Sequence, residues 1–196
     1  MGTAATNPPR PRLAAMLSGA GRTFLNLLES CEDGRLHASM SLVITSRECP
    51  GADRARAHGI TTVVAPGLVS RDRLSAILAE HAIDLVALAG YLRRLEVPAQ
   101  YRDKIVNIHP ALLPDFGGPG MYGERVHAAV LSTGRGESGC TVHFVDDRYD
   151  TGAILAQQSV SVMPGDTVAT LAARVFAAEC DLYPRTIDAL LKARTG

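Results

Sequence analysis

Short apolar runs recur along the chain, and most are followed by a stretch whose apolar positions suit a helix. The runs are short and most are closed by Gly, Pro or Ser, a pattern typical of strands, and the run at 39–46 is also rich in β-branched residues. They lie at residues 13–17, 39–46, 60–65, 84–89 and 105–109. Helices are predicted from the turn at 18–23 to residue 31, and at 52–58, 71–81 and 124–132. This alternation predicts an α/β fold with a single doubly wound, mostly parallel sheet.

The last third of the chain has a different pattern. Polar and apolar residues alternate at 140–145, and an extended segment returns at 153–162, which predicts an antiparallel edge hairpin near 140–162. A final helix is expected at 168–180, followed by a separate last turn after Pro184. On the predicted helix at 124–132, His127 is expected at the surface or edge.

Length and composition limit the classes of protein. The 196 residues suffice for one domain at 13–196, preceded by a Pro-rich stretch at 1–12 that we expect to be a flexible leader. Twenty basic and twenty acidic residues cancel, so no overall charge favours nucleic acid or a membrane surface. The four cysteines form no close pairs, which favours a reducing, cytoplasmic setting and no metal site. We expect small-molecule substrates and a monomer or homodimer.

The stretch at 105–120 carries the main candidate for chemistry. Side chains alternate along a strand, so Asn107 and His109 share one face, and Pro110 ends the regular pairing at the strand's carboxyl end. Open α/β sheets bind ligands at that end. An amide donor beside an imidazole suits acyl transfer, in which an oxyanion forms and a proton moves. The alternative is a buried core histidine and an asparagine that caps a turn.

A third candidate is Asp150, in the loop after the first hairpin strand. A carboxylate near His109 would favour the charged imidazole and fix the ring. Asp146, Asp147 and Asp150 could instead be ordinary turn residues. The chain has no Gly-x-Ser-x-Gly motif and no recognisable cysteine nucleophile, so direct transfer without a covalent enzyme intermediate fits better.

Two other segments are candidates for binding. Gly19 and Gly21 allow close approach to free N–H groups at a helix start, which predicts a phosphate site to which Arg22 could add a charge. The turn is only a partial dinucleotide motif, and a simple strand-to-helix connection is the alternative. Arg93 and Arg94 follow the fourth strand and should line the same crevice, unless they only form a solvated face.

Together these segments resemble a known family. The chain from about 13 to 184 is similar to folate-dependent formyltransferases in five blocks: Ser18-Gly-Ala-Gly21, Ala89-Gly-Tyr-Leu-Arg93, Asn107-Ile-His-Pro-Ala-Leu-Leu-Pro114, Gly139-Cys-Thr-Val-His-Phe-Val145 and Asp150-Thr-Gly152. The resemblance implies a Rossmann-like formyltransferase fold. It also implies transfer of the formyl group of 10-formyltetrahydrofolate to the amine of 5-phosphoribosylglycinamide in purine biosynthesis, with no metal. An aminosugar nucleotide as acceptor, or a noncatalytic nucleotide-binding module, remains an alternative.

The resemblance also implies roles for particular residues. Asn107 would bind the formyl oxygen, His109 would stabilise it and move a proton, and Asp150 would raise the pKa of His109. The ribonucleotide would contact Gly19, Ala20, Gly21, Arg22, Thr23, Pro110 and Glu179. The folate would contact Arg71, Leu92, Arg93, Arg94, Leu95, Asp146, Asp147, Arg148 and Tyr149.

Two segments depart from the family pattern. The turn reads Gly21-Arg22-Thr23 where many members have Gly-Ser-Asn, and the loop at 116–123 lacks the histidines of some members. We therefore predict that Arg22 supplies a charge-assisted phosphate contact in place of the usual side chains.

Overall fold

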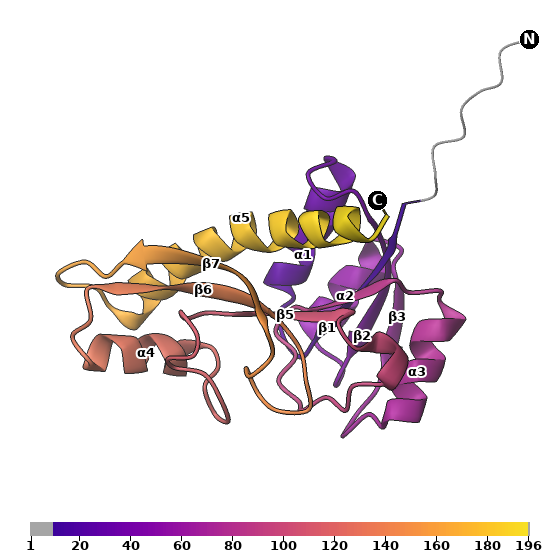
Figure 1. The fold of residues 1–196 in the computed structure, drawn as a ribbon, viewed down its shortest axis with the longest axis horizontal. Coiled ribbons are helices and arrows are strands. Elements are labelled where there is room, and N and C mark those ends of the chain that lie inside the picture. Colours follow the sequence, from indigo (N-terminus) through magenta and orange to yellow (C-terminus); the bar gives the residue numbers. More distant parts are fainter. Residues whose placement is uncertain (1–9, 196) are drawn as a thin grey trace, which may run out of the picture.

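The computed structural model describes residues 10–195, which build one seven-stranded sheet in the order β3-β2-β1-β4-β5-β6-β7 (Figure 1). The strands are β1 (Arg12–Leu17), β2 (Ser39–Thr45), β3 (Thr61–Val64), β4 (Leu85–Leu88), β5 (Ile105–His109), β6 (Glu137–Phe144) and β7 (Ile154–Ser161). Strands β1 to β5 pair in parallel, whereas β6 and β7 run antiparallel. The predicted doubly wound sheet with an antiparallel edge hairpin is confirmed.

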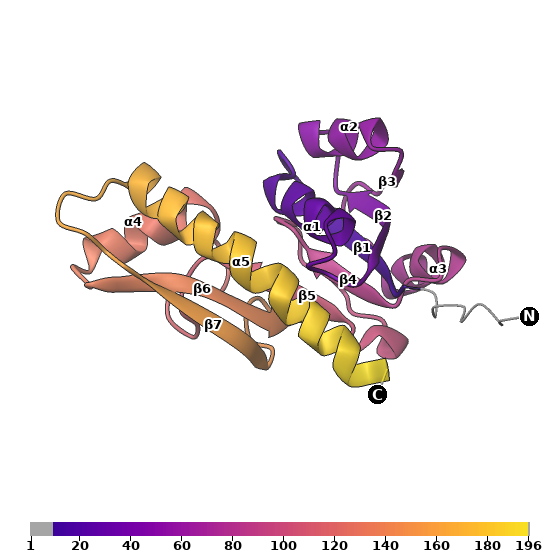
Figure 2. The same cartoon turned by 90° about the horizontal axis from the view of Figure 1, so that it is seen from above.

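Helices cover both faces of this sheet (Figure 2). They are α1 (Arg22–Glu32), α2 (Pro50–Ala57), α3 (Arg71–Glu80), α4 (Glu124–Ser132) and α5 (Val168–Thr195), with a short 3-10 helix, η1 (Ala99–Tyr101), before β5. Alternate residues of β1 belong to different cores, because successive side chains leave a strand on opposite faces. One core lies under α1, α2, α4 and α5, and the other lies under α3.

Two strands begin earlier than predicted. Strand β6 begins at Glu137, before the predicted start at residue 140, and β1 begins at Arg12, inside the predicted leader. Arg10 is also in contact with the domain, since its guanidinium donates to the carbonyl of Cys31 at 3.3 Å. Residues 1–9 of the predicted leader lie outside the described residues.

The prediction of a separate last turn after Pro184 is wrong, because α5 continues through this proline to Thr195. A proline inside a helix removes one backbone hydrogen bond and costs about 3 kcal/mol. Tyr183, Ile187 and Leu191 are spaced four residues apart and are all buried on the same core. Burying each such side chain contributes about 1.5–3 kcal/mol, so packing on both sides of the proline outweighs the lost bond.

Candidate active site

A cavity of about 540 Å³ opens where β4 and β5 end. That volume suits a small-molecule site. Most of the residues predicted to bind or react line it: Arg22, Thr23, Leu92, Arg93, Arg94, Leu95, Asn107, His109, Pro110, Asp146, Arg148, Tyr149, Asp150 and Glu179. Gly19, Ala20, Gly21, Arg71 and Asp147 are not among its lining residues.

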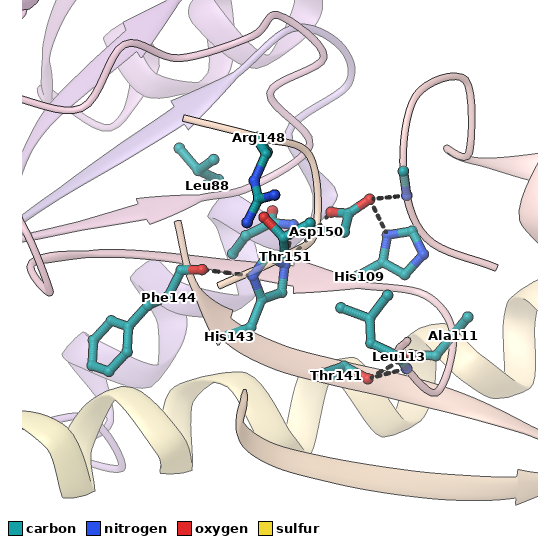
Figure 3. Close-up of polar contacts among 12 residues, drawn as sticks. Leu88, His109, Ala111, Leu113, Thr141, His143, Phe144, Arg148, Asp150 and Thr151 are labelled. Carbon is teal, nitrogen blue, oxygen red and sulfur yellow. Dashed lines mark hydrogen bonds and ion pairs between the residues drawn. The ribbon is translucent and has the colours of Figure 1, made fainter. Parts of the chain in front are cut away.

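Strands β5 and β6 supply the polar centre of the cavity (Figure 3). Their antiparallel register places Asn107 opposite His143, and His109 opposite Thr141. Directly opposed residues project from the same face of the sheet, so Thr141 and His143 of β6 lie on the same face as Asn107 and His109 of β5. The predicted shared face of Asn107 and His109 is therefore extended by a second pair that comes from the neighbouring strand.

The His109 ring is 3% exposed and is held from both sides. Its Nε2 lies 2.8 Å from the carbonyl oxygen of Phe116, and its Nδ1 lies 3.6 Å from Oδ2 of Asp150. A carbonyl only accepts, so Nε2 carries a hydrogen and Nδ1 is the nitrogen that can gain or lose a proton. Burial lowers the pKa of His109; Asp150 acts in the opposite direction without outweighing burial.

Asp150 lies between two imidazoles (Figure 3). Its Oδ2 faces His109, and its Oδ1 is 3.6 Å from Nε2 of His143; the backbone N–H of Gly118 donates to Oδ2 at 2.9 Å. Burial alone would raise the pKa of Asp150, but these contacts outweigh it and the pKa is lowered. The residue has a positive φ of 56°, a left-handed conformation that only a minority of non-glycine residues adopt. The surrounding contacts hold this carboxylate ionised beside His109.

The loop after β5 packs tightly against His109 and Asp150. Phe116 contacts His109 and Gly118 contacts Asp150, while Gly117 lies between them. A Cβ added at Gly117 would lie 2.5 Å from Cδ2 of Leu113 and 3.2 Å from Cβ of Asp150. Glycine at this position therefore allows the loop backbone to approach the carboxylate.

At the other end of the cavity, Arg22 begins α1 directly after Gly21, whose positive φ of 76° closes the Gly-rich turn. The Arg22 guanidinium stacks over the Phe176 ring, 3.8 Å from its centroid. Glu179 lines the same end, and burial raises its pKa to about 7, with Arg22 acting in the opposite direction. A cation, free helix N–H groups and a largely enclosed carboxyl group are therefore brought together here.

Arg71 and Asp147 lie behind the cavity wall and contact each other. Arg71 Nη2 is 2.8 Å from Oδ2 of Asp147, and its Nε donates to the carbonyl of Val97. Oδ1 of Asp147 accepts from the N–H of Val97 at 3.1 Å. The two residues thus join α3 to the loops at 92–97 and 145–153, which both border the cavity.

Sequence reasoning missed two histidines of the site. His127 was expected at the helix surface or edge, which is wrong: it is 5% exposed and lines the cavity that also contains His109. His143 lies in the block Gly139–Val145, for which the sequence pattern predicts no site residue. The alternation at 140–145 places Thr141 and His143 on one face, and that signal could have identified the second residue.

Comparison with known proteins places this geometry in a family. The family model described as "Formyl transferase" matches residues 11–187. The chain belongs to the formyl transferase family. A formyl transferase relative, "Phosphoribosylglycinamide formyltransferase, chloroplastic" of Arabidopsis thaliana, is 42% identical over 197 residues, covering 95% of this chain and 68% of the relative.

Solved structures of formyl transferases have the same fold. Glycinamide ribonucleotide transformylase 1 from Symbiobacterium toebii has a TM-score of 0.87 and 33% identity, covering 98% of this chain and 93% of the other. Phosphoribosylglycinamide formyltransferase from Brucella melitensis has a TM-score of 0.83 and 37% identity, covering 95% and 97%. Within residues 10–195, no helix has the length and apolar content to cross a membrane.

Proposed function

We propose that this chain transfers the formyl group of 10-formyltetrahydrofolate to the primary amine of 5-phosphoribosylglycinamide. The observation that carries the proposal is the convergence of Asn107, His109 and Asp150 at one cavity. The similarity to phosphoribosylglycinamide formyltransferases supports this choice of acceptor. The formyltransferase domain that we propose comprises residues 13–196.

The catalytic residues divide the chemistry among them. Asn107 donates an N–H to the formyl oxygen as negative charge develops there. Nδ1 of His109 accepts the proton that the attacking amine gives up, and can return it when the carbon–nitrogen bond of the donor breaks. Asp150 stabilises the imidazolium that forms between these events. None of these steps requires a covalent enzyme intermediate.

The folate would occupy the end of the cavity near the loop at 92–95. Leu88, Leu92, Leu95 and Val145 give this end an apolar wall, and Leu92 and Tyr149 expose 49% and 39% of their surfaces. A flat heterocycle suits such a wall, and the exposed Arg93, Arg94 and Arg148 suit an anionic tail. The bound folate supplies the formyl carbon; Arg71 and Asp147 hold the two loops around it.

The ribonucleotide would occupy the opposite end. Its phosphate would meet the N-terminus of α1, where the Gly19–Gly21 turn, Arg22 and Thr23 offer backbone donors and one cation. Glu179 lies on the facing helix, α5, and we assign it to the hydrogen-bonding groups of the acceptor. This arrangement points the amine toward Pro110 and His109.

Activity assays with three acceptors test the proposal. The purified protein should convert 10-formyltetrahydrofolate only when 5-phosphoribosylglycinamide is present, and much faster than with an aminosugar nucleotide or with water. Transfer to the aminosugar nucleotide alone would replace this acceptor with the alternative. His109→Ala should lower kcat by about 10²–10⁴-fold; unchanged turnover by this variant would refute the catalytic assignment.

Arg22→Ala tests the departure from the family turn. Loss of a charge-assisted phosphate contact should raise KM for the ribonucleotide by roughly 10- to 100-fold, with little change in kcat or in KM for the folate. Arg54→Ala is the matched control, because Arg54 binds the carbonyl of Ala20 on the same turn but does not line the cavity. Equal effects of the two substitutions would indicate that Arg22 acts only on the shape of the turn.

A further inference from the structure

Asn107 and His143 face each other across β5 and β6, where both residues line the cavity. Nδ2 of Asn107 lies 3.0 Å from Nε2 of His143, and the two residues are opposed in the strand register. His143 is 2% exposed. Because so little of the imidazole is exposed, its two ring nitrogens take their hydrogen-bond partners from the protein. The contact therefore has to join one donor to one acceptor.

The second ring nitrogen of His143 decides which partner is the donor. Its Nδ1 lies 2.7 Å from the carbonyl oxygen of Phe144. A carbonyl only accepts, so Nδ1 carries the hydrogen, and a neutral imidazole then has a lone pair at Nε2. Of the two ends of the Asn107 amide, only the NH₂ group can donate a hydrogen bond to that lone pair. The tautomer of His143 therefore selects one of the two orientations of the Asn107 side chain.

We propose that His143 is a positioning residue, which keeps the Asn107 amide turned so that its nitrogen, not its oxygen, serves the reacting formyl group. One N–H of Nδ2 is bound to His143, and the second remains free on a residue that lines the cavity. If the amide turned over, its oxygen would replace Nδ2 and repel the developing oxyanion. This inference rests on the proposed function, since it supposes that a formyl oxygen binds there.

A competing contact involves Asp150. Its Oδ1 is 3.6 Å from Nε2 of His143, longer than the 3.0 Å contact with Asn107. A carboxylate only accepts, so it receives no hydrogen bond from a nitrogen with a lone pair. A charged His143 would instead donate to Asp150 and leave the amide without an acceptor. The two roles couple His143 to different residues, and this difference can be measured.

A double-mutant cycle separates the contact of His143 with Asn107 from its contact with Asp150. His143→Leu should lower kcat by roughly 10- to 100-fold in the otherwise unchanged protein, but less than about twofold when Asn107 is already alanine. KM for both substrates should change little. His143→Gln, whose amide oxygen can accept, should restore most of the rate. The proposal would be overturned if His143→Leu lowered kcat by the same factor in the Asn107→Ala background as in the unaltered protein. It would also be overturned if the effect of His143→Leu on kcat depended on Asp150→Asn instead. Thermal unfolding of each variant checks that the fold survives.

A spectroscopic measurement on the unaltered protein does not depend on any variant. With ¹⁵N-labelled histidine and asparagine, the Nε2 resonance of His143 should have the shift of an unprotonated ring nitrogen and should couple across the hydrogen bond to Nδ2 of Asn107. A protonated Nε2 at the assay pH would overturn the positioning role even if formyl transfer is observed. If the nitrogen is unprotonated and no transfer occurs, the proposed function fails separately.

Discussion

Glu179 offers a stability measurement that tests how the site is built. It lies in the cavity wall with its pKa raised to about 7, chiefly by burial. Raising a carboxyl pKa from the usual 4.5 to about 7 corresponds to about 3 kcal/mol. This value is an upper bound, because the side chain borders a cavity that solvent can enter.

The sign of the effect follows from proton linkage. Below about pH 4.5 the carboxyl is protonated in both states and makes no difference to the free energy of unfolding. Between 4.5 and about 7 the unfolded chain releases this proton while the folded protein keeps it, so the stability of the folded protein falls as pH rises. Above about pH 7 the loss is complete and remains constant.

Glu179→Gln removes the ionisation and keeps the shape of the side chain. The variant should exceed the unaltered protein in stability by less than about 1 kcal/mol at pH 5 and by up to about 3 kcal/mol at pH 8. For a domain of this size, the gap at pH 8 corresponds to a rise in Tm of roughly 6–12 °C. Urea unfolding at several pH values measures the difference directly.

Glu80→Gln is the matched control, since Glu80 is exposed at the end of α3 and should give no pH-dependent gap. KM for the ribonucleotide should rise in Glu179→Gln, because the acceptor loses a charged partner. A stability gap that is the same at pH 5 and pH 8, or that grows as pH falls, would refute the account of a carboxyl group destabilised by burial.

Three further substitutions test other parts of the site. Asp150→Asn should lower kcat by about 10²-fold or more. It should also move the acid limb of the pH–rate profile to lower pH, because no carboxylate then favours protonation of His109. An acid limb that moves to higher pH would contradict this account. Gly117→Ala should lower kcat at least about tenfold by displacing the loop from Asp150, whereas Gly136→Ala, where an added Cβ meets no atom within 4 Å, should leave the rate unchanged. Tyr183→Phe should lower the free energy of unfolding by about 1 kcal/mol, because the buried hydroxyl donates to the carbonyl oxygens of two strands. Thermal unfolding should show this as a fall in Tm of roughly 2–4 °C. An unchanged Tm would mean that the hydroxyl contributes no net stability.

The sequence predicted the sheet and its edge hairpin because strand periodicity is a local property. Pro184 shows where local rules fail: the preference of proline for helix ends was overcome by packing on both sides, which involves residues far away in the chain. His127 shows the same limitation, since its burial depends on the segments that surround α4 in the fold and form the cavity with it.

From the sequence, only residues on the same face of one strand could be predicted to lie together in the site. Asn107 and His109 lie two residues apart on β5, so their proximity follows from alternation alone. The partnership with His143 requires the register between β5 and β6, which no local pattern contains. The contact between Arg71 and Asp147 joins residues 76 positions apart in the chain, so no local pattern predicts it.

The antiparallel pairing of β5 with β6 has a consequence for how this chain can change in length. Shifting β6 by a single residue would send Thr141 and His143 to the opposite side of the sheet, so an insertion or deletion within the strand would dismantle the site without touching any residue of β5. The bend at 133–136 between α4 and β6 carries no such restriction, because its residues are mostly exposed. Peptide tags or reporter segments are therefore best inserted at that bend.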